Sequence, residues 1–335
     1  MPTKQKPILL SGIQPSGHLC IGNYLGALKN WVSLQETHDS IFLVVDMHAL
    51  TVRQNPAELR QRCLSYVAQY IACGIDPEKS TIVIQSHVSQ HAELMWILST
   101  LTYMGELNRM TQFKDKSKKH AANINAGLFT YPILMASDIL LYQADLVPVG
   151  ADQKQHLELA RDLAIRFNST YSDTFVVPEP CIPKSGARIM SLQEPEKKMS
   201  KSDENLNNLI AILDSADIVK KKIKRAVTDS GSEVRMDKSS PGISNLVQLY
   251  SLITDLSVKE VESQYSGKMY SDFKTDLGTI IADFLEPVQK KYDEISKDKA
   301  YLESVLAKGA ENAFYRGRKT LSKVYRKVGF IQPAR

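Results

Sequence analysis

The alternation of short apolar runs with longer helical patterns constrains the fold of this chain more than any other feature. In the first half, apolar and β-branched runs predict strands at 6–10, 41–46, 81–85 and 146–150. Between them, apolar residues at helical spacing predict helices at 25–34, 57–72, 92–102 and 132–142. Strand–helix–strand alternation is typical of a parallel sheet that is covered by helices on both faces. We therefore predict an α/β fold with an open, doubly wound parallel sheet.

The pattern changes after residue 152 and predicts a second, smaller domain. One more amphipathic helix is expected at 152–167, followed by a passage rich in Pro and Gly and then by a lysine-rich segment at 196–203. From Leu206 onward the patterns are helical, for example at 215–227 and 271–296, and none is convincing as a strand. We predict an α/β domain over 1–205, a helical domain over 206–295, and terminal helices over 296–335. These terminal helices can pack back on the first domain.

Composition limits the class of protein. The 335 residues are enough for two domains, and the 43% hydrophobic and 24% charged fractions are typical of a globular protein rather than a disordered one. The apolar stretch 41–45 is too short to cross a bilayer, and the first residues lack the apolar core of a signal peptide. We expect a cytoplasmic protein with no membrane segment.

Cysteines and net charge narrow the choice further. Cys20, Cys63, Cys73 and Cys181 lie far apart and form no C-x-x-C pair, a spacing that predicts neither a zinc site nor a disulfide framework and suits a reducing cytosol. The net charge is +5, from 42 basic and 37 acidic residues. Such an excess permits an anionic partner such as nucleic acid but does not require one.

The segment 11–23 directly follows the first predicted strand and is the first motif that points to chemistry. Gly12 and Gly17 allow a tight turn and a close approach of ligand to backbone, and a helix is expected to begin near His18 or Leu19. Free N–H groups and the dipole at such a helix start favour phosphate. The segment is neither GxxxxGK[ST] nor GxGxxG, which disfavours Walker-type ATPases and dinucleotide binders. On its own it is equally well explained as a plain strand–turn–helix junction.

The second motif is the lysine-rich run Lys197-Lys198-Met199-Ser200-Lys201-Ser202. Small hydroxyl residues between lysines form a loop that can present two ammonium groups to one polyphosphate, where they stabilise the charge on a departing pyrophosphate. The structural alternative is a solvated charge run, which is what most lysine clusters are.

Together, the two segments resemble the HIGH and KMSKS signatures of class I aminoacyl-tRNA synthetases. KMSKS is matched letter for letter, and HIGH appears in the shortened form Cys20-Ile21-Gly22-Asn23, similar to the variant of tryptophanyl-tRNA synthetases. Further matches follow in order at 12–17, 45–49, 105–106, 110–114, 138–142 and 147–156. The chain therefore resembles the bacterial-type tryptophanyl-tRNA synthetases over nearly its whole length.

The resemblance implies a Rossmann-like catalytic domain, a helical domain that binds the tRNA anticodon, and a homodimer. It implies that L-tryptophan is activated with ATP to tryptophanyl-adenylate and is then transferred to the 3′ end of tRNA(Trp). Mg²⁺ would be carried on the ATP phosphates, with no protein-bound metal. The implied catalytic residues are Lys198, Lys201, Ser200 and Gln14. The implied ATP-binding residues are Gln14, Pro15, Ser16, Gly22, Asn23, Gly150, Ala151, Asp152, Ile189, Lys198, Met199, Ser200, Lys201, Ser202 and Lys116.

Asp138 can also be judged on physical grounds. It lies in an otherwise apolar helix, which we expect Pro132 to open, and a carboxylate on such a face needs a partner. An indole N–H only donates, so an acceptor at the bottom of an aromatic slot would select tryptophan. A salt-bridged or capping aspartate is the structural alternative. The resemblance assigns Asp138 the indole role, with Tyr131, Met135, Val147 and Val149 as walls, His48 near the amino acid, and Gln153 on its ammonium group.

Other functions remain to be separated from this one. A tyrosyl-tRNA synthetase would share the fold, but its pocket needs groups that both accept from and donate to a phenol, and Asp138 has no second polar partner on its helix. A small-molecule nucleotidylyltransferase would not need the helical domain. A non-enzymatic RNA-binding protein would leave both phosphate loops unexplained.

Two positions depart from the family pattern. Cys20 stands where threonine is usual, which predicts a weaker thiol contact to ATP in place of a hydroxyl one. Leu10 stands where an aromatic residue is common, so one wall of the indole slot is expected to differ.

Overall fold

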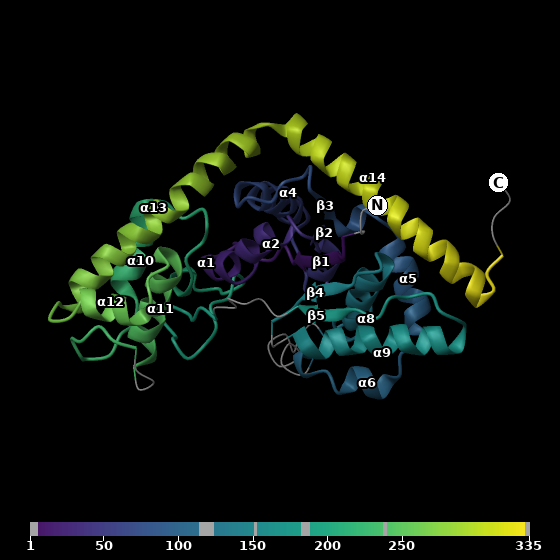
Figure 1. Cartoon of the computed structure of the whole chain (residues 1–335), viewed down its shortest axis with the longest axis horizontal. Helices are drawn as coiled ribbons and strands as arrows, with labels where there is room; N and C mark the ends of the chain where they lie inside the picture. The colour runs from purple at the N-terminus through teal and green to yellow at the C-terminus, as the bar shows by residue number, and fades with distance from the viewer. Residues whose placement is uncertain (1–5, 114–123, 151–152, 182–187, 237–239, 332–335) are drawn as a thin grey trace, which may run out of the picture.

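A five-stranded parallel sheet forms the centre of the computed structural model, which describes residues 6–113, 124–150, 153–181, 188–236 and 240–331. The strand order is β3-β2-β1-β4-β5 (Figure 1). The strands are β1 (Ile8–Ile13), β2 (Asp39–Val44), β3 (Ser80–Ile84), β4 (Leu146–Pro148) and β5 (Glu179–Cys181). The order reverses between β1 and β4, and ligands of such sheets bind in the crevice outside the carboxyl ends of the strands at this point.

Each face of the sheet is covered by helices, as the continuous apolar runs of its strands require. Leu9, Phe42 and Val44 pack on one side with η1 (Tyr24–Leu28), α2 (Lys29–Leu34) and α4 (Pro56–Ala72). Leu10, Leu43 and Val83 pack on the other side with α5 (Gln90–Ser99), α8 (Ala126–Leu141) and α9 (Lys154–Thr170). The prediction of an open, doubly wound parallel sheet is confirmed.

Short elements follow the carboxyl ends of the first three strands, where they shape the crevice. They are α1 (Ile21–Asn23) after β1, α3 (Asp46–Ala49) after β2 and η2 (Gln85–His87) after β3. Two further short helices lie elsewhere, α6 (Met104–Asn108) and η5 (Leu206–Asn208).

A group of helices forms the other end of the molecule (Figure 1). It contains α10 (Ala216–Arg225), α11 (Pro241–Thr254), α12 (Val258–Gln264) and most of α13 (Tyr270–Lys297). The rings of Tyr250, Tyr265 and Phe273 pack against each other there, with centroids 4.9 to 5.8 Å apart. No helix within the described residues is long and apolar enough to span a membrane.

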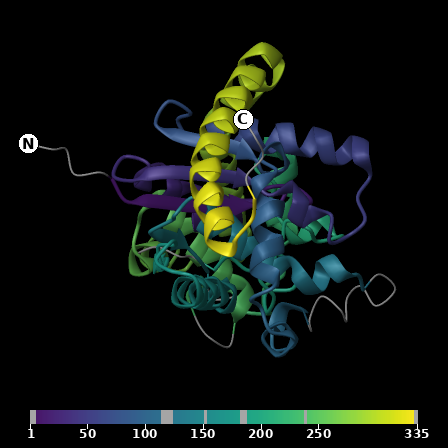
Figure 2. The same cartoon turned by 90° about the vertical axis from the view of Figure 1, so that its right-hand side faces the viewer.

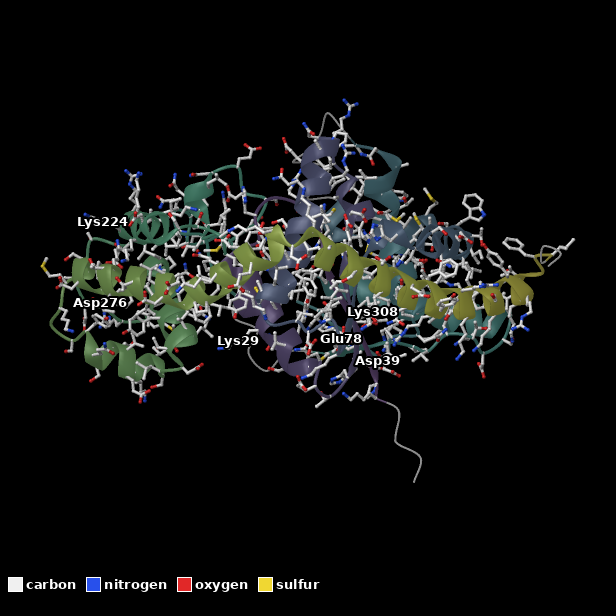
Figure 3. All side chains as sticks on the ribbon, turned by 90° about the horizontal axis from the view of Figure 1, so that it is seen from above. Lys29, Asp39, Glu78, Lys224, Asp276 and Lys308 are labelled. Carbon is white, nitrogen blue, oxygen red and sulfur yellow. The ribbon has the colours of Figure 1, made fainter. Side chains whose placement is uncertain are left out.

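The last long helix returns to the sheet. After a break at Asp298, α14 (Lys299–Val328) runs back alongside β3 and α5 (Figures 1 and 2). A Cβ at Gly309 would lie only 1.8 Å from the carbonyl oxygen of Ile82, so this close crossing over β3 requires glycine. Ion pairs from Lys308 to Glu78 and from Arg316 to Asp39 join the helix to the sheet at its surface; Figure 3 shows Lys308 and Glu78 close together there.

Three local expectations were wrong. Helix α8 begins at Ala126, because Asn125 caps it by accepting from the Leu128 N–H, and Pro132 lies inside the helix rather than at its start. The helix after β1 begins at Ile21 rather than near His18, whose N–H instead donates to the Lys201 carbonyl. Strand β5 was not foreseen, because its sequence Glu-Pro-Cys has no apolar run and its proline has no N–H to donate to a neighbouring strand.

Candidate active site

A cavity of about 710 Å³ opens at the carboxyl edge of the sheet, between the segments that follow β1, β2 and β4. Its size is within the usual range for small-molecule sites. All seven residues predicted to bind tryptophan line it: Asp138, Tyr131, Met135, His48, Val147, Val149 and Gln153. Eight of those predicted to bind ATP do so as well: Gln14, Gly22, Asn23, Gly150, Ile189, Lys198, Met199 and Lys201.

The remaining predicted ATP residues are placed differently. Pro15, Ser16, Ser200 and Ser202 are not among the lining residues. The hydroxyls of Ser200 and Ser202 lie 3.2 Å apart, at an exposed position beside Lys201. Lys116, Ala151 and Asp152 lie outside the described residues.

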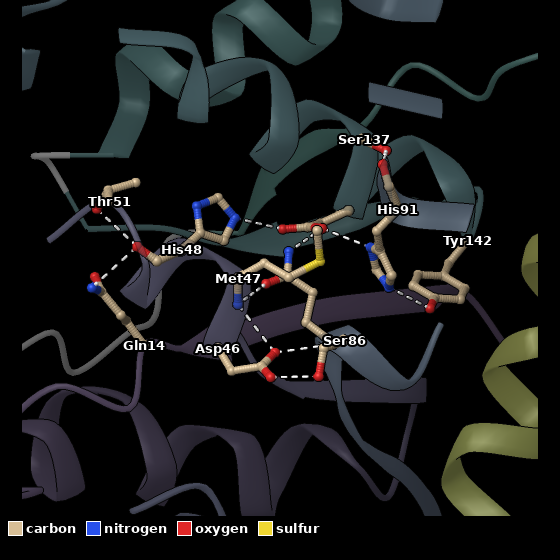
Figure 4. Close-up of polar contacts among 11 residues, drawn as sticks. Gln14, Asp46, Met47, His48, Thr51, Ser86, His91, Ser137 and Tyr142 are labelled. Carbon is tan, nitrogen blue, oxygen red and sulfur yellow. Dashed lines mark hydrogen bonds and ion pairs between the residues drawn. The ribbon is translucent and has the colours of Figure 1, made fainter. Parts of the chain in front are cut away.

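The Asp138 carboxylate lies at the wall of the cavity and is held by three side chains from other elements, of which His48 and His91 are labelled in Figure 4. Its Oδ1 accepts from Gln85 Nε2 at 2.7 Å and from His91 Nδ1 at 2.6 Å. Its Oδ2 accepts from His48 Nε2 at 2.8 Å. A carboxylate oxygen accepts about two hydrogen bonds. Oδ1 is therefore saturated, whereas Oδ2 retains capacity for one more donor.

These contacts keep Asp138 ionised. Burial alone would raise its pKa, but the hydrogen bond from His48 and the attraction and hydrogen bond of His91 outweigh it and hold the pKa at about 2. Asp138 lies in the last turn of α8, whose N-cap is Asn125 and whose C-cap is Tyr142, so it does not cap the helix. The site therefore presents a permanent negative acceptor, only 3% exposed, between apolar walls.

A second layer of contacts fixes the residues that hold Asp138. His91 Nε2 lies 2.8 Å from the Tyr142 hydroxyl, so both ring nitrogens of His91 have a hydrogen-bond partner. The His91 carbonyl accepts from Ser137 Oγ at 2.6 Å. The side-chain Oε1 of Gln85 accepts from the Met47 N–H at 3.2 Å, which directs the Gln85 NH₂ group toward Asp138.

Gln85 and His91 were missed by the sequence analysis. A signal existed for Gln85, because it directly follows β3 and so lies at the same edge as the other site residues. His91 lies on α5 and meets Asp138 only because α5 and α8 pack side by side. No sequence spacing indicates that pair.

The lysine-rich segment is closed against the loop after β1. Gly17 has φ +66°, and a Cβ there would lie 1.8 Å from the Lys201 carbonyl oxygen, which accepts from the His18 N–H at 3.0 Å. The Lys201 ammonium donates to the Gln14 carbonyl oxygen. Desolvation by burial lowers the pKa of Lys201 to about 7.

The two motifs also pack directly on each other beside α1. A Cβ at Gly22 would lie 3.6 Å from Ile189 and 3.9 Å from Met199, within ordinary van der Waals contact of both. Cys20 is 1% exposed, and its thiol and its N–H both bond the Asn23 side-chain oxygen, at 3.2 and 3.1 Å. Burial raises the pKa of Cys20, so it stays a thiol. The thiol thus has a partner within the chain, Asn23, and the expected thiol contact to ATP stays a prediction.

The remaining wall residues connect the two halves of the cavity. Gln14 Nε2 donates to the His48 carbonyl at 3.4 Å, which links the loop after β1 to the Asp138 end. The Tyr131 hydroxyl lies 2.9 Å from His156 Nε2 and 3.3 Å from the Gln112 side-chain oxygen. Leu10, 4% exposed, supplies an aliphatic wall where an aromatic one is common.

Comparisons with known proteins show the family of this chain. The family model described as tRNA synthetases class I (W and Y) matches residues 2–286. A tryptophan–tRNA ligase of Clostridium acetobutylicum is 56% identical over 98% of this chain and 99% of its own, and one of Clostridium tetani is 57% identical over 97% and 96%.

Solved structures give the same result. A tryptophanyl-tRNA synthetase from Mycoplasma pneumoniae superposes with a TM-score of 0.89 at 36% identity, over 98% of this chain and 99% of that one. The Campylobacter jejuni enzyme complexed with ADP and tryptophan superposes with a TM-score of 0.82 at 35% identity, over 96% and 100%. The chain therefore belongs to the class I tRNA synthetase family of the tryptophan and tyrosine enzymes.

Proposed function

We propose that this chain is a tryptophan–tRNA ligase, which activates L-tryptophan with ATP and transfers it to the 3′ end of tRNA(Trp). The observation that carries the proposal is the ionised Asp138 at the cavity wall, whose Oδ2 can accept one further hydrogen bond. The high identity to the two clostridial tryptophan–tRNA ligases supports the same substrate.

The amino-acid end of the cavity suits an indole. Val147 and Val149 are apolar walls near Asp138, and an indole N–H is the kind of donor that Oδ2 still lacks. Phenylalanine has no such donor, and sites built around a substrate hydrogen bond reject analogues without it by about 10⁴–10⁵-fold. A pocket of this kind needs no editing domain.

The first chemical step would be adenylate formation. The tryptophan carboxylate is ionised near neutral pH, attacks the α-phosphate of ATP in line and expels pyrophosphate, so no general base is required. Gln14, Gly22 and Asn23 would lie near the nucleotide, and Lys198 and Lys201 would stabilise the charge on the phosphates. Mg²⁺ would be carried by the phosphates, which is its usual mode with nucleotides.

Of the remaining proposed ATP residues, those that the structure describes are not among the residues that line the cavity. Ser200 would lie beside the phosphates, since it adjoins Lys201 in the same loop. The other proposed contacts come from the family motif alone, and they are Pro15, Ser16, Ser202, Ala151, Asp152 and Lys116.

The second step would engage the tRNA. A ribose hydroxyl at its 3′ terminus would attack the activated carbonyl, with the 2′ position favoured by class I membership. The helical end would meet the anticodon through α10, where Lys220, Lys221, Lys224 and Arg225 are exposed; Figure 3 shows Lys224 at that end. Lys222 does not belong to this face, because it is buried and pairs with Asp214 at 2.6 Å.

The domain division, quaternary structure and location belong to the same proposal. We propose a catalytic domain over 1–205, a tRNA-binding helical domain over 206–295 and terminal helices over 296–335. We also propose a homodimer that works in the cytoplasm, as the family resemblance implies.

Amino-acid-dependent ATP–pyrophosphate exchange tests the proposal. We expect exchange with tryptophan and none with tyrosine or without an amino acid. Exchange with tyrosine alone would reject the specificity. Exchange with neither amino acid would reject the synthetase function and leave a small-molecule nucleotidylyltransferase as the alternative.

A further inference from the structure

Tyr66, on α4, contacts both phosphate-binding segments but is not a lining residue of the active-site cavity. Its hydroxyl donates to the carbonyl oxygens of Ser16, at 3.0 Å, and Gly17, at 3.3 Å. Its ring lies 5.3 Å from the Lys201 ammonium. The side chain is 1% exposed. One buried tyrosine thus joins the loop after β1 to the lysine of the KMSKS segment.

The hydroxyl fixes the shape of the turn. Gly17 has a left-handed φ of +66°, and two successive carbonyls of this turn accept from the same O–H. Burial raises the pKa of Tyr66, so the hydroxyl remains a donor at any working pH. Losing it would leave these carbonyls without that donor and free the turn that starts at Gln14.

The ring acts on Lys201. A cation within about 6 Å of an aromatic centroid is attracted to the face of the ring, and the attraction grows when water is excluded. The Lys201 ammonium lies at that distance and also donates to the Gln14 carbonyl. Both contacts hold the ammonium at the edge of the active-site cavity, which Lys201 lines.

We propose that Tyr66 is a positioning residue for adenylate formation. Its hydroxyl holds the loop after β1 in the shape that binds the nucleotide, and its ring holds Lys201 at the phosphates. The inference rests on the proposed function. Tyr66 acts through other groups: the cavity it does line, of about 960 Å³, lies on the α4 side, with Arg62, Gln69 and Tyr292.

The two roles can be separated by substitution. Tyr66→Phe removes the hydroxyl and keeps the ring, whereas Tyr66→Leu removes both. Tyr70→Phe is the matched control, because Tyr70 lies one turn later on α4, is fully buried, and donates its O–H to the Leu43 carbonyl at 3.2 Å, in β2. For each variant, kcat and the KM values for ATP and tryptophan are measured by pyrophosphate exchange, together with Tm.

We expect Tyr66→Phe to raise KM for ATP about tenfold, as the loss of one hydrogen bond allows, with kcat and KM for tryptophan unchanged. Tyr66→Leu should also lower kcat about tenfold, because Lys201 loses the attraction of the ring. Tyr70→Phe should leave all three constants unchanged, even if its Tm falls as far as that of Tyr66→Phe.

Other results would overturn the inference. Equal rises in the two KM values for Tyr66→Phe, or kinetics like those of Tyr70→Phe, would reduce Tyr66 to a structural role. Unchanged kcat in Tyr66→Leu would remove the role of the ring. Should Tyr66→Leu fail to fold, Tyr66→Trp, which keeps an aromatic face, replaces it and should retain kcat within about threefold; a larger loss contradicts the proposal. Failure of the proposed function is a separate result, because the unaltered chain would then show no tryptophan-dependent exchange.

Discussion

His48 Nε2 donates to Asp138 Oδ2 at 2.8 Å, joining α3, which follows β2, to the last turn of α8 across 90 positions of sequence. This contact fixes the Asp138 end of the cavity and leaves Oδ2 able to accept one more hydrogen bond. The same contact therefore stabilises the buried charge of Asp138 and leaves an acceptor for a substrate donor.

Replacing the carboxylate by an amide should separate tryptophan binding from ATP binding. In Asp138→Asn the acceptor loses its charge, and its NH₂ group must face either Gln85 and His91 or His48, all of which donate. We expect KM for tryptophan to rise about 100-fold, since hydrogen bonds to charged groups contribute about 1.5–3 kcal/mol. KM for ATP should stay within about twofold. Parallel changes in both constants would contradict the assigned role.

The ionisation of Asp138 should appear in the pH dependence of stability. Its pKa is lowered from 3.8 to about 2 in the folded chain, so its stabilising contribution is complete above the unfolded pKa, near pH 4, and is lost as the pH falls toward 2. The contribution is about 2 kcal/mol. Urea unfolding from pH 5 downward should therefore show a smaller acid-dependent loss for Asp138→Asn than for the unaltered chain. Identical slopes would show that folding does not lower the pKa of Asp138.

His91 should contribute strongly to the stability of the fold. It is 0% exposed, and His91→Phe would leave Asp138 Oδ1 with one donor fewer and the Tyr142 hydroxyl without its partner. We expect a loss of about 3 kcal/mol in the free energy of unfolding, because a buried charge loses a hydrogen bond. Tyr142→Phe keeps the contact between His91 and Asp138, so it should lower the free energy of unfolding by only about 1 kcal/mol. Similar losses for both would show that Asp138 does not depend on His91.

The lowered pKa of Lys201 predicts the pH range of catalysis. Because its pKa is about 7, the free enzyme loses this positive charge as the pH rises above 7, and kcat/KM for ATP should fall there. Lys201→Arg keeps its charge throughout and should show a flatter alkaline limb, though with lower activity, because guanidinium differs in shape. An unchanged alkaline limb in Lys201→Arg would assign the fall to another group.

Gly17→Ala tests whether the two loops must close on each other. A Cβ at Gly17 would meet the Lys201 carbonyl at 1.8 Å, in addition to the strain of φ +66°. Gly267→Ala is the control, since its φ is +76° and no atom lies within 4 Å of the added Cβ. Both should lose about 1 kcal/mol of stability from backbone strain, but only Gly17→Ala should lose about 100-fold or more in kcat/KM for ATP. Equal activities would show that the closed contact is not needed.

Much of the fold follows from local sequence signals. The β-branched runs of β1 to β3 and the glycines after β1 predict a parallel sheet with a phosphate site at its edge, because period and turn chemistry are local properties. Strand β5 has no such signal, since the exposed Glu179 and Pro180 and the partly buried Cys181 form a strand only by pairing with β4. The start of α8 depends on the Asn125 cap, which outweighs the usual meaning of Pro132.

The site residues differ in the same way, because some carry a local sequence signal and others do not. Asp138 could be singled out because a lone carboxylate in an apolar helix is anomalous in the sequence itself. Gln85 could have been placed at the same edge of the sheet, because it directly follows β3. The contacts of Gln85 and His91 with Asp138 could not be predicted, because they depend on the packing of η2 and α5 against α8. The contact of Tyr66 with Lys201 likewise requires the closed arrangement of two distant loops.

The most direct test compares tryptophan with an isosteric analogue in which oxygen replaces the indole N–H. Binding of each is measured by calorimetry to the unaltered chain and to Asp138→Asn. If Asp138 Oδ2 accepts from the indole, the unaltered chain should bind tryptophan at least about 30-fold more tightly than the analogue, and the variant should lose most of this preference. Equal affinities of the unaltered chain for the two ligands would contradict the account.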